Sequence, residues 1–352
     1  MKLKLILTGG GTGGHILPNL ALVPYLRAKF DIYYIGSSNS MESELVPRYG
    51  IPFYSVPCIK FSRGISFKNF GIPLTLSNGI SRAKQIMDDI KPDFVFGKGG
   101  YVALPVIKAA SKLKIPYAIH ESDMSMGLSN RLVASKAAFV CGSFADSVSK
   151  LNNGIHTGAP IRNALYGGKA DKARQELGIS AAKPILLVMG GSSGALALNT
   201  YLLQGLDRLT KKFVVIHLTG KGKATAPTIR NAYYPLEFVS NIENLYALAD
   251  LCVTRGGAGA LFEVAALRVP SLIIPLPKSR SSRGDQVSNA RRFAELGYSM
   301  VLPQENLTAD RLISDIELLS NRAGNLRLNM QSARNIDGSQ KIVELIMGAV
   351  KK

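Results

Sequence analysis

The stretch Gly9-Gly10-Gly11-Thr12-Gly13-Gly14-His15 decides how the chain folds. It follows the apolar run Leu3-Lys4-Leu5-Ile6-Leu7 and precedes a segment whose apolar residues recur at helical spacing, so it predicts a turn between a strand and a helix. Glycines in such a turn let backbone N–H groups approach a phosphate at the N-terminus of the helix. The stretch therefore predicts a nucleotide-type ligand, and His15 adds a titratable side chain beside it.

Two alternatives exist for this turn. Gly9, Gly11 and Gly14 satisfy the pattern GxGxxG, which is typical of dinucleotide-binding turns. Such a site requires an acidic residue about 20 positions later, at the end of the second strand, to bind the ribose. The second apolar run, 32–35, continues into Gly-Ser-Ser-Asn at 36–39 without a carboxylate, which disfavours a dinucleotide. The other alternative is a turn that only packs the helix on the strand.

Composition limits the class of protein. A length of 352 residues favours two domains, and an apolar content of 46% excludes a largely disordered chain. No apolar run approaches the roughly 20 residues of a membrane span, and the N-terminal residues do not resemble a signal peptide. Cys58, Cys141 and Cys252 are scattered, which indicates buried thiols in a reducing compartment rather than disulfides or metal ligands.

The net charge of +19 indicates either an anionic partner or many solvated basic side chains. Nucleic acid and an anionic membrane surface are the candidate partners. The chain has no nucleic-acid motif of interleaved aromatic and basic residues, so nucleic acid is not expected as a partner. A membrane contact is predicted near Phe61, Phe67, Lys68 and Phe70, where apolar anchors alternate with cations. Ordinary core packing with a charged rim is the alternative for this segment.

Short apolar runs alternate with helical patterns in both halves of the chain. The predicted strands are 3–8, 32–35, 93–97, 116–119 and 138–141, then 185–189, 213–218, 236–239, 250–254 and 271–275. This alternation predicts right-handed βαβ units and a parallel sheet in each half. The fold class is therefore α/β, with domains expected at 1–160 and 161–335 and a C-terminal helix at 336–352 that returns to the first domain.

Three further glycine-rich segments follow predicted strands, at 97–101, 190–194 and 255–260. Ligands of parallel sheets bind beyond the carboxyl ends of the strands. Four such loops therefore predict that both domains contribute to a ligand site, in a cleft between their parallel sheets.

Six segments, taken in order, resemble one known family. They are GGGTGGH at 9–15, GKGGY at 97–101, His120-Glu121, TGAPIR at 157–162, GGSSGA at 190–195 and DQVSNA at 285–290. Together they are similar to the MurG glycosyltransferases, and the resemblance covers nearly the whole chain. It implies a GT-B fold of two Rossmann-like domains. It also implies an inverting transfer of N-acetylglucosamine (GlcNAc) from UDP-GlcNAc to lipid I, undecaprenyl-pyrophosphoryl-MurNAc-pentapeptide, which forms lipid II in peptidoglycan synthesis.

The resemblance also implies roles for individual residues. His15 corresponds to the essential histidine of the family and is expected to act as the general base. Residues implied to bind the donor are Gly11, Thr12, Gly13, Asp123, Arg162, Ser192, Val239, Ala258, Gly259, Ala260, Leu261, Phe262, Glu263, Gln286 and Asn289. Residues implied at the acceptor and its diphosphate are Gly14, Gly99, Gly100, Tyr101, His120, Glu121 and Asn130.

Within these sets the implied contacts differ. The backbone of Val239 is implied to meet the uracil, Glu263 suits the ribose hydroxyls, and Gln286 with Asn289 would read the sugar. His120 is expected either to support the structure or to contact the acceptor. Many members of the family have HEQN where this chain has His-Glu-Ser-Asp at 120–123, so Asp123 replaces an asparagine contact.

No Asp-x-Asp occurs in the sequence, so no metal or other cofactor is expected. Helix N-termini and Arg162 would stabilise the leaving diphosphate instead. The resemblance implies a peripheral location on the cytoplasmic side of the cell membrane, with lipid I, anionic phospholipids and other cell-wall synthesis proteins as partners. A UDP-sugar epimerase of the same two-domain plan is the main alternative, and an NAD(P)-linked oxidoreductase is a further one.

Overall fold

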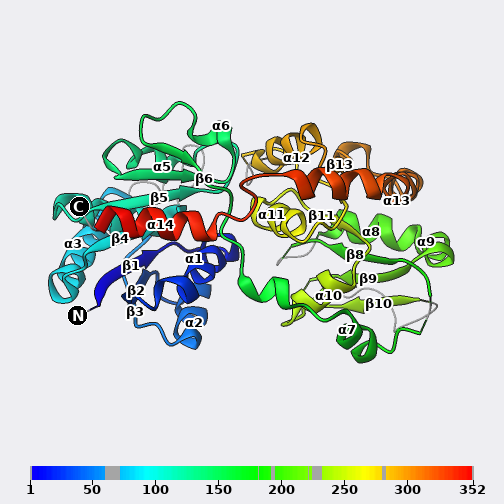
Figure 1. Ribbon diagram of the computed structural model, residues 1–352, viewed down its shortest axis with the longest axis horizontal. Coiled ribbons are helices and arrows are strands. Elements are labelled where there is room, and N and C mark those ends of the chain that lie inside the picture. Colours follow the sequence, from blue (N-terminus) through cyan, green and yellow to red (C-terminus); the bar gives the residue numbers. More distant parts are fainter. Residues whose placement is uncertain are drawn as a thin grey trace. The chain divides into compact units, whose positions relative to one another are not determined.

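The computed structural model describes residues 2–59, 72–180, 182–191, 195–220, 222–223, 232–279 and 283–350. The chain forms two units, which are coloured along the sequence in Figure 1. Unit 1 consists of Met1–Arg162 and Asn335–Lys352, and unit 2 consists of Asn163–Arg334. Each unit contains one parallel sheet with helices around it, which confirms the α/β class predicted from the alternating pattern.

Unit 1 contains a seven-stranded sheet in the order β3-β2-β1-β4-β5-β6-β7. Its strands are β1 (Leu3–Thr8), β2 (Phe30–Gly36), β3 (Phe53–Ser55), β4 (Phe94–Gly97), β5 (Tyr117–Glu121), β6 (Phe139–Gly142) and β7 (Gly154–His156). Its helices are α1 (Gly13–Leu26), α2 (Met41–Leu45), α3 (Ile72–Ile90), α4 (Gly100–Lys112), α5 (Leu128–Arg131), α6 (Ala145–Val148) and α14 (Ser339–Val350), with 3-10 turns η1 (Val46–Tyr49) and η3 (Ala134–Lys136). The edge strands β3 and β7 were not predicted, because three residues are too few to show an alternating pattern.

The central strands β4, β5 and β6 are buried along their whole length, and since successive side chains point to opposite sides of a sheet, both faces are covered. Leu5 and Leu7 belong to a core cluster with residues of α1 and α14, whereas Ile6 belongs to a second cluster with residues of α3 and α4. The sheet therefore lies between two helical layers. The C-terminal α14, red in Figure 1, packs in unit 1 through Ile342 and Ile346.

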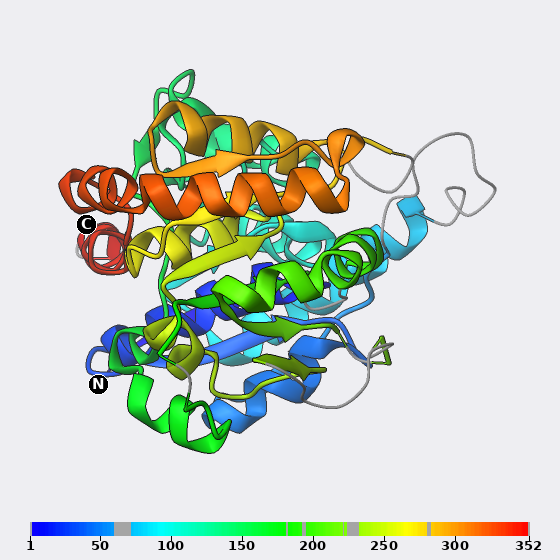
Figure 2. The same cartoon turned by 90° about the vertical axis from the view of Figure 1, so that its right-hand side faces the viewer.

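Unit 2 contains a six-stranded sheet in the order β10-β9-β8-β11-β12-β13. Its strands are β8 (Ile185–Met189), β9 (Val214–Leu218), β10 (Tyr233–Leu236), β11 (Leu251–Thr254), β12 (Ser271–Ile273) and β13 (Ser299–Val301). Its helices are α7 (Ala170–Glu176), α8 (Leu196–Gln204), α9 (Leu206–Lys212), α10 (Ile242–Leu248), α11 (Ala258–Ala266), α12 (Asp285–Glu295) and α13 (Ala309–Ser332), with η4 (Asn163–Gly167) and η5 (Gln304–Asn306). Figure 2 shows the long α13, in orange, running along this unit.

One predicted strand of unit 2 is misplaced. The apolar run predicted a strand at 236–239, but β10 ends at Leu236 and the following residues form a loop. Phe238 in this loop is 80% exposed, so its apolar character does not arise from core packing.

Two segments of unit 1 lie side by side where the chain leaves this unit and where it returns. The Ala159 N–H donates to Ile336 O at 3.0 Å, and the Gly338 N–H donates to Ala159 O at 2.8 Å. Gly158 adopts a φ of +86°, and a Cβ there would lie 2.2 Å from Asn335 O, so only glycine fits. Within the described residues, no helix is long and apolar enough to cross a membrane.

Candidate functional site

The two glycine-rich loops of unit 1 pack against each other at the carboxyl ends of β1 and β4, which are neighbours in the sheet. Gly100 has a φ of +78°, and a Cβ there would lie 2.9 Å from Gly10 O and 3.1 Å from the His15 ring. Gly11 has a φ of +82°, and a Cβ there would lie 2.7 Å from the Tyr101 ring. Both glycines are thus required for the close approach that brings His15 and Tyr101 to the same pair of loops.

His15 lies in the first turn of α1, which begins at Gly13 behind an extended Thr12. Its backbone N–H donates to Thr12 O at 3.0 Å, and its side chain is half-buried beside Gly100. Thr12 and Gly14 are exposed in the same loop. The predicted position of His15 at the mouth of the loop is therefore where the structure places it, while its role as a base stays a prediction.

A buried lysine that the sequence analysis did not identify lies behind the second loop. Lys98 is 1% exposed, and its Nζ is 2.6 Å from His120 Nδ1 and also contacts Ser122 Oγ. An ammonium group only donates, so Nδ1 of His120 accepts, and Nε2 carries the proton that is donated to Gly158 O at 3.0 Å. Burial lowers the pKa of Lys98 to about 8. Burial, and after it the Lys98 charge, hold the pKa of His120 well below its usual value.

His120 has no exposed surface, and both of its ring nitrogens have partners. Of the two roles expected for this residue, its position favours support of the structure over contact with an acceptor. His217 is likewise buried, between Tyr233 Oη and Asn199 Oδ1.

Glu121 and Asn130 hold the loop that follows β5. The Glu121 carboxylate accepts hydrogen bonds from Asp123 N at 3.1 Å, Gly127 N at 2.9 Å and Asn130 Nδ2 at 2.8 Å. Asn130 also donates to His120 O at 3.2 Å and packs against Gly99. The two side chains are almost completely buried, so they fix the course of this loop, which carries the half-buried Asp123.

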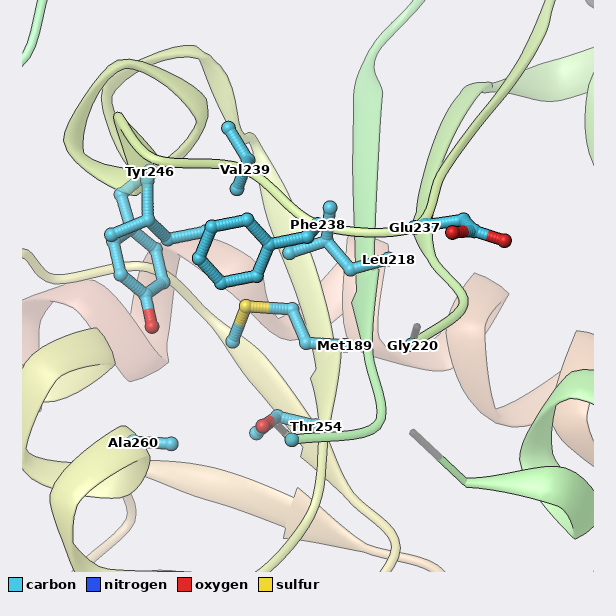
Figure 3. A pocket seen from close by; sticks show the side chains of 11 residues that line it. Met189, Leu218, Gly220, Glu237, Phe238, Val239, Tyr246, Thr254 and Ala260 are labelled. Carbon is cyan, nitrogen blue, oxygen red and sulfur yellow. The ribbon is translucent and has the colours of Figure 1, made fainter. Parts of the chain in front are cut away.

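Unit 2 contains a cavity of about 210 Å³ beyond the carboxyl ends of β8, β9, β10 and β11. The residues that line it are Met189, Gly191, Leu218, Gly220, Glu237, Phe238, Val239, Ile242, Tyr246, Thr254 and Ala260. In Figure 3 the side chains of Phe238, Tyr246 and Met189 lie close together above Thr254 and Ala260. Two aromatic rings and a thioether form an apolar surface that suits a flat ring. The predicted donor residues Val239 and Ala260 both line this cavity.

Tyr246 connects this cavity to Glu263. Its hydroxyl donates to Glu263 Oε2 at 3.2 Å, from α10 to α11. The sequence did not single out Tyr246, because a tyrosine in a helical pattern is normally a core residue. Its ring is buried and its hydroxyl is bonded to Glu263, so only the folded structure shows that it belongs to the site.

Several predicted donor residues of α11 and α12 serve the core or the loops. Leu261 and Phe262 are buried, and the Phe262 ring contacts Phe293 edge to face at 5.2 Å, so only their backbone is available to a ligand. Ala258 is buried at the start of α11, whereas a Cβ at Gly259 would meet open space.

The predicted sugar-reading pair on α12 holds the loop after β11. Gln286 Oε1 accepts hydrogen bonds from Gly256 N at 3.2 Å and Leu276 N at 2.9 Å. Asn289 has no exposed surface, and its amide donates to Gly256 O at 3.2 Å. The buried amide of Asn289 thus supports the loop, and its role in reading a sugar stays a prediction.

The remaining predicted residues are placed as follows. Arg162 is half-buried at the end of the first segment of unit 1. Ser192, Phe61, Phe67, Lys68 and Phe70 lie outside the described residues. Within the part of the chain that the structure describes, no group of three or more His, Cys, Asp or Glu side chains is arranged to hold a metal ion.

Residues 5–141 match the glycosyltransferase family 28 N-terminal domain, and residues 185–346 match the glycosyltransferase family 28 C-terminal domain. The chain is 40% identical to the UDP-N-acetylglucosamine--N-acetylmuramyl-(pentapeptide) pyrophosphoryl-undecaprenol N-acetylglucosamine transferase of Lachnospira eligens, over 97% of this chain and 98% of that protein. It is also 40% identical to the protein of the same name from Clostridium botulinum, over 100% of this chain and 99% of that protein.

Solved structures agree on the fold. MurG of Acinetobacter baumannii has a TM-score of 0.77 at 26% identity, over 98% of this chain and 99% of that chain. The UDP-GlcNAc 2-epimerase from Neisseria meningitidis, bound to UDP-GlcNAc, has a TM-score of 0.69 at 14% identity, over 99% and 100% of the two chains. The second likeness concerns the fold alone, and the first confirms the expected GT-B fold.

Proposed function

This chain belongs to glycosyltransferase family 28 and to its MurG members, and from that premise we propose that it transfers GlcNAc from UDP-GlcNAc to lipid I, forming lipid II. The observation that carries this proposal is the 40% identity over 97% of the chain to a transferase named for that reaction. The MurG structure, similar over 98% of the chain, supports it.

The cavity of unit 2 supports the assignment of a nucleotide donor. Its apolar wall at Phe238 and Tyr246 suits the uracil ring, and the Val239 backbone lies in the same loop. Glu263, oriented by the Tyr246 hydroxyl, offers a carboxylate to ribose hydroxyls. The N-terminus of α11 adds positive potential for the diphosphate.

His15 is proposed to act as the general base. An acceptor hydroxyl attacks C1 of GlcNAc from the face opposite the diphosphate, so the configuration at C1 inverts. The new C1–O bond forms as the bond from C1 to the β-phosphate oxygen breaks, and UDP leaves with that electron pair. The imidazole of His15 takes the proton of the acceptor hydroxyl.

A transfer assay with the purified chain tests this proposal. Incubation with UDP-GlcNAc and a lipid I analogue is expected to give one lipid II analogue for each UDP released. A UDP-sugar epimerase would instead form the 2-epimer without an acceptor, and an oxidoreductase would require a nicotinamide cofactor. Either of those results, without transfer to the acceptor, would replace the proposed function.

Catalysis is proposed to need no divalent cation. The sequence contains no Asp-x-Asp, and Arg162 with the helix N-termini offers positive charge to the leaving diphosphate. Transfer is expected to retain its rate in excess EDTA and to gain less than about twofold when Mg²⁺ is added. Abolition by EDTA and recovery with Mg²⁺ would contradict this account.

The chain is proposed to contact the cytoplasmic face of the cell membrane through Phe61, Phe67, Lys68 and Phe70, with anionic phospholipids and other cell-wall synthesis proteins as partners. The net charge of +19 supports attraction to an anionic surface. Binding to vesicles that contain anionic lipid is expected to exceed binding to neutral vesicles and to weaken as salt rises.

A triple variant tests the same contact. Phe67→Ser, Lys68→Glu and Phe70→Ser together are expected to lower vesicle binding and lipid I turnover, because they remove two apolar anchors and reverse a charge worth about 1 kcal/mol near the surface. Turnover of a soluble acceptor analogue is the control and is expected to be unchanged. A folded triple variant that still sediments with anionic vesicles like the wild type would place the contact elsewhere.

A further inference from the structure

A buried carboxylate lies directly beneath the first glycine-rich loop. Glu42, on α2, has no exposed surface. Its Oε2 accepts a hydrogen bond from Gly11 N at 3.2 Å, and its Oε1 accepts from Ser37 N at 3.2 Å and Ser37 Oγ at 2.7 Å. None of these three donors carries a charge. Glu42 is therefore held by two backbone N–H groups and a hydroxyl rather than by a cation.

Burying such a group costs free energy, which suggests that Glu42 has a role that an apolar residue could not fill. An ionised carboxylate loses its hydration on burial, and hydrogen bonds from neutral donors restore only part of the loss. Replacing buried ionic groups by apolar side chains of similar volume often leaves a protein equally or more stable. The neighbouring glycines also make room for this carboxylate. A Cβ at Gly10 would lie 2.2 Å from Glu42 Oε1, and one at Gly36 would lie 2.8 Å from Glu42 Cγ.

The loop that Glu42 holds is the one against which His15 and Tyr101 are packed. Gly10 O and the His15 ring both border Gly100, and Gly11 borders the Tyr101 ring. Burial, and after it the Glu42 charge, raise the pKa of Tyr101. The Gly11 N–H, which the sequence pattern offered to a phosphate, is already used by the protein's own anion.

We propose that Glu42 is a positioning residue for the transfer reaction, which fixes the Gly10–Gly11 peptide against His15 and keeps the substrate diphosphate away from the Gly11 N–H. This inference rests on the proposed function. It reserves the Gly11 N–H for Glu42 and leaves the substrate diphosphate to other donors.

The variant Glu42→Gln tests this inference. Its amide retains the shape of the side chain but has a single oxygen, so it cannot accept from both Gly11 N and Ser37 N. We expect kcat to fall about 10- to 100-fold, the size of effect that follows from a small misplacement of a reacting group. The Kd for UDP, measured by calorimetry, is expected to stay within about twofold of the wild type. The calorimetric stoichiometry gives the folded fraction, so kcat is counted per binding-competent molecule.

Glu44→Gln is the matched control, because Glu44 is exposed on the same helix and loses the same charge. Its kcat and KM are expected to equal those of the wild type. If Glu42→Gln does not fold, Glu42→Asp replaces it with the same expectation, since the shorter side chain cannot reach both Gly11 N and Ser37 N.

Three results separate the possibilities. A wild-type chain without transfer activity contradicts the proposed function itself. With an active wild type, an unchanged kcat in a folded Glu42 variant overturns the positioning role. A UDP Kd that rises tenfold or more in the Glu42 variant also overturns it, whatever happens to kcat, because the loop would then bind the diphosphate.

Discussion

Replacing His15 with alanine is expected to lower kcat by about 10²- to 10⁴-fold while UDP binding is retained, because the variant loses the group that accepts the acceptor proton. His15 lies in the first turn of α1, beside the paired glycine loops of unit 1. The proposed uracil cavity is formed by residues of unit 2, so removing the imidazole leaves it intact. Single-turnover rates with a lipid I analogue and the Kd for UDP measure the two effects separately.

His156→Gln is the control for His15→Ala, because it also replaces a half-buried histidine of unit 1. His156 is the other half-buried histidine of unit 1, on the edge strand β7, and its Nε2 lies 3.2 Å from Ser143 O. Its replacement is expected to change kcat by less than about twofold. A His15→Ala variant with near-normal turnover would remove the base from the mechanism, and a large loss in His156→Gln would show that the assay reports folding rather than chemistry.

The apolar runs that alternate with helical patterns predicted the parallel sheets, because strands buried on both faces are mostly apolar along their length. The same rule explains the misplaced strand at 236–239. Val239 and Phe238 are apolar because they line a cavity, and an apolar pattern alone does not separate a pocket wall from a core strand. The three-residue strands β3, β7 and β13 were missed because pairing with a neighbouring strand, rather than their own sequence, makes them strands.

The candidate site was predictable where it depends on local sequence and unpredictable where it depends on contacts between distant elements. Glycine loops after apolar runs predicted both the positions of the loops and the place of His15. Lys98 looks like a solvated cation between glycines, yet it is buried against a histidine 22 positions later. Glu42 accepts a hydrogen bond from Gly11, 31 positions away in the sequence, and no local pattern predicts such a contact. Asn289 was assigned to the sugar by resemblance, and nothing in the sequence indicated that its side chain is buried in the fold.

The second large effect is expected on stability rather than on chemistry. His120→Ala is expected to lower the free energy of unfolding by about 3 kcal/mol, because it removes two buried hydrogen bonds, one of them to a charged group. The Lys98 ammonium loses the acceptor Nδ1 at 2.6 Å, and the Gly158 carbonyl loses its donor at 3.0 Å. Gly158 lies close to the point where the chain leaves unit 1, so the lost hydrogen bond is expected to destabilise the segment around Gly158. Urea unfolding of the two proteins measures the difference.

Lys98→Met tests how the buried charge contributes to stability while His120 is still present. Methionine is a straight, apolar side chain, so this change removes a desolvated cation and leaves His120 still able to donate to Gly158 O. Its cost is expected to be smaller than that of His120→Ala, because the group that loses its partner is the neutral Nδ1 of His120 rather than a charge. The double variant Lys98→Met with His120→Ala is expected to be more stable than His120→Ala alone, because it no longer buries an ammonium group that has lost its imidazole acceptor. If His120→Ala is as stable as the wild type, or the double variant is less stable than His120→Ala, the lysine–histidine pair is not what holds this segment.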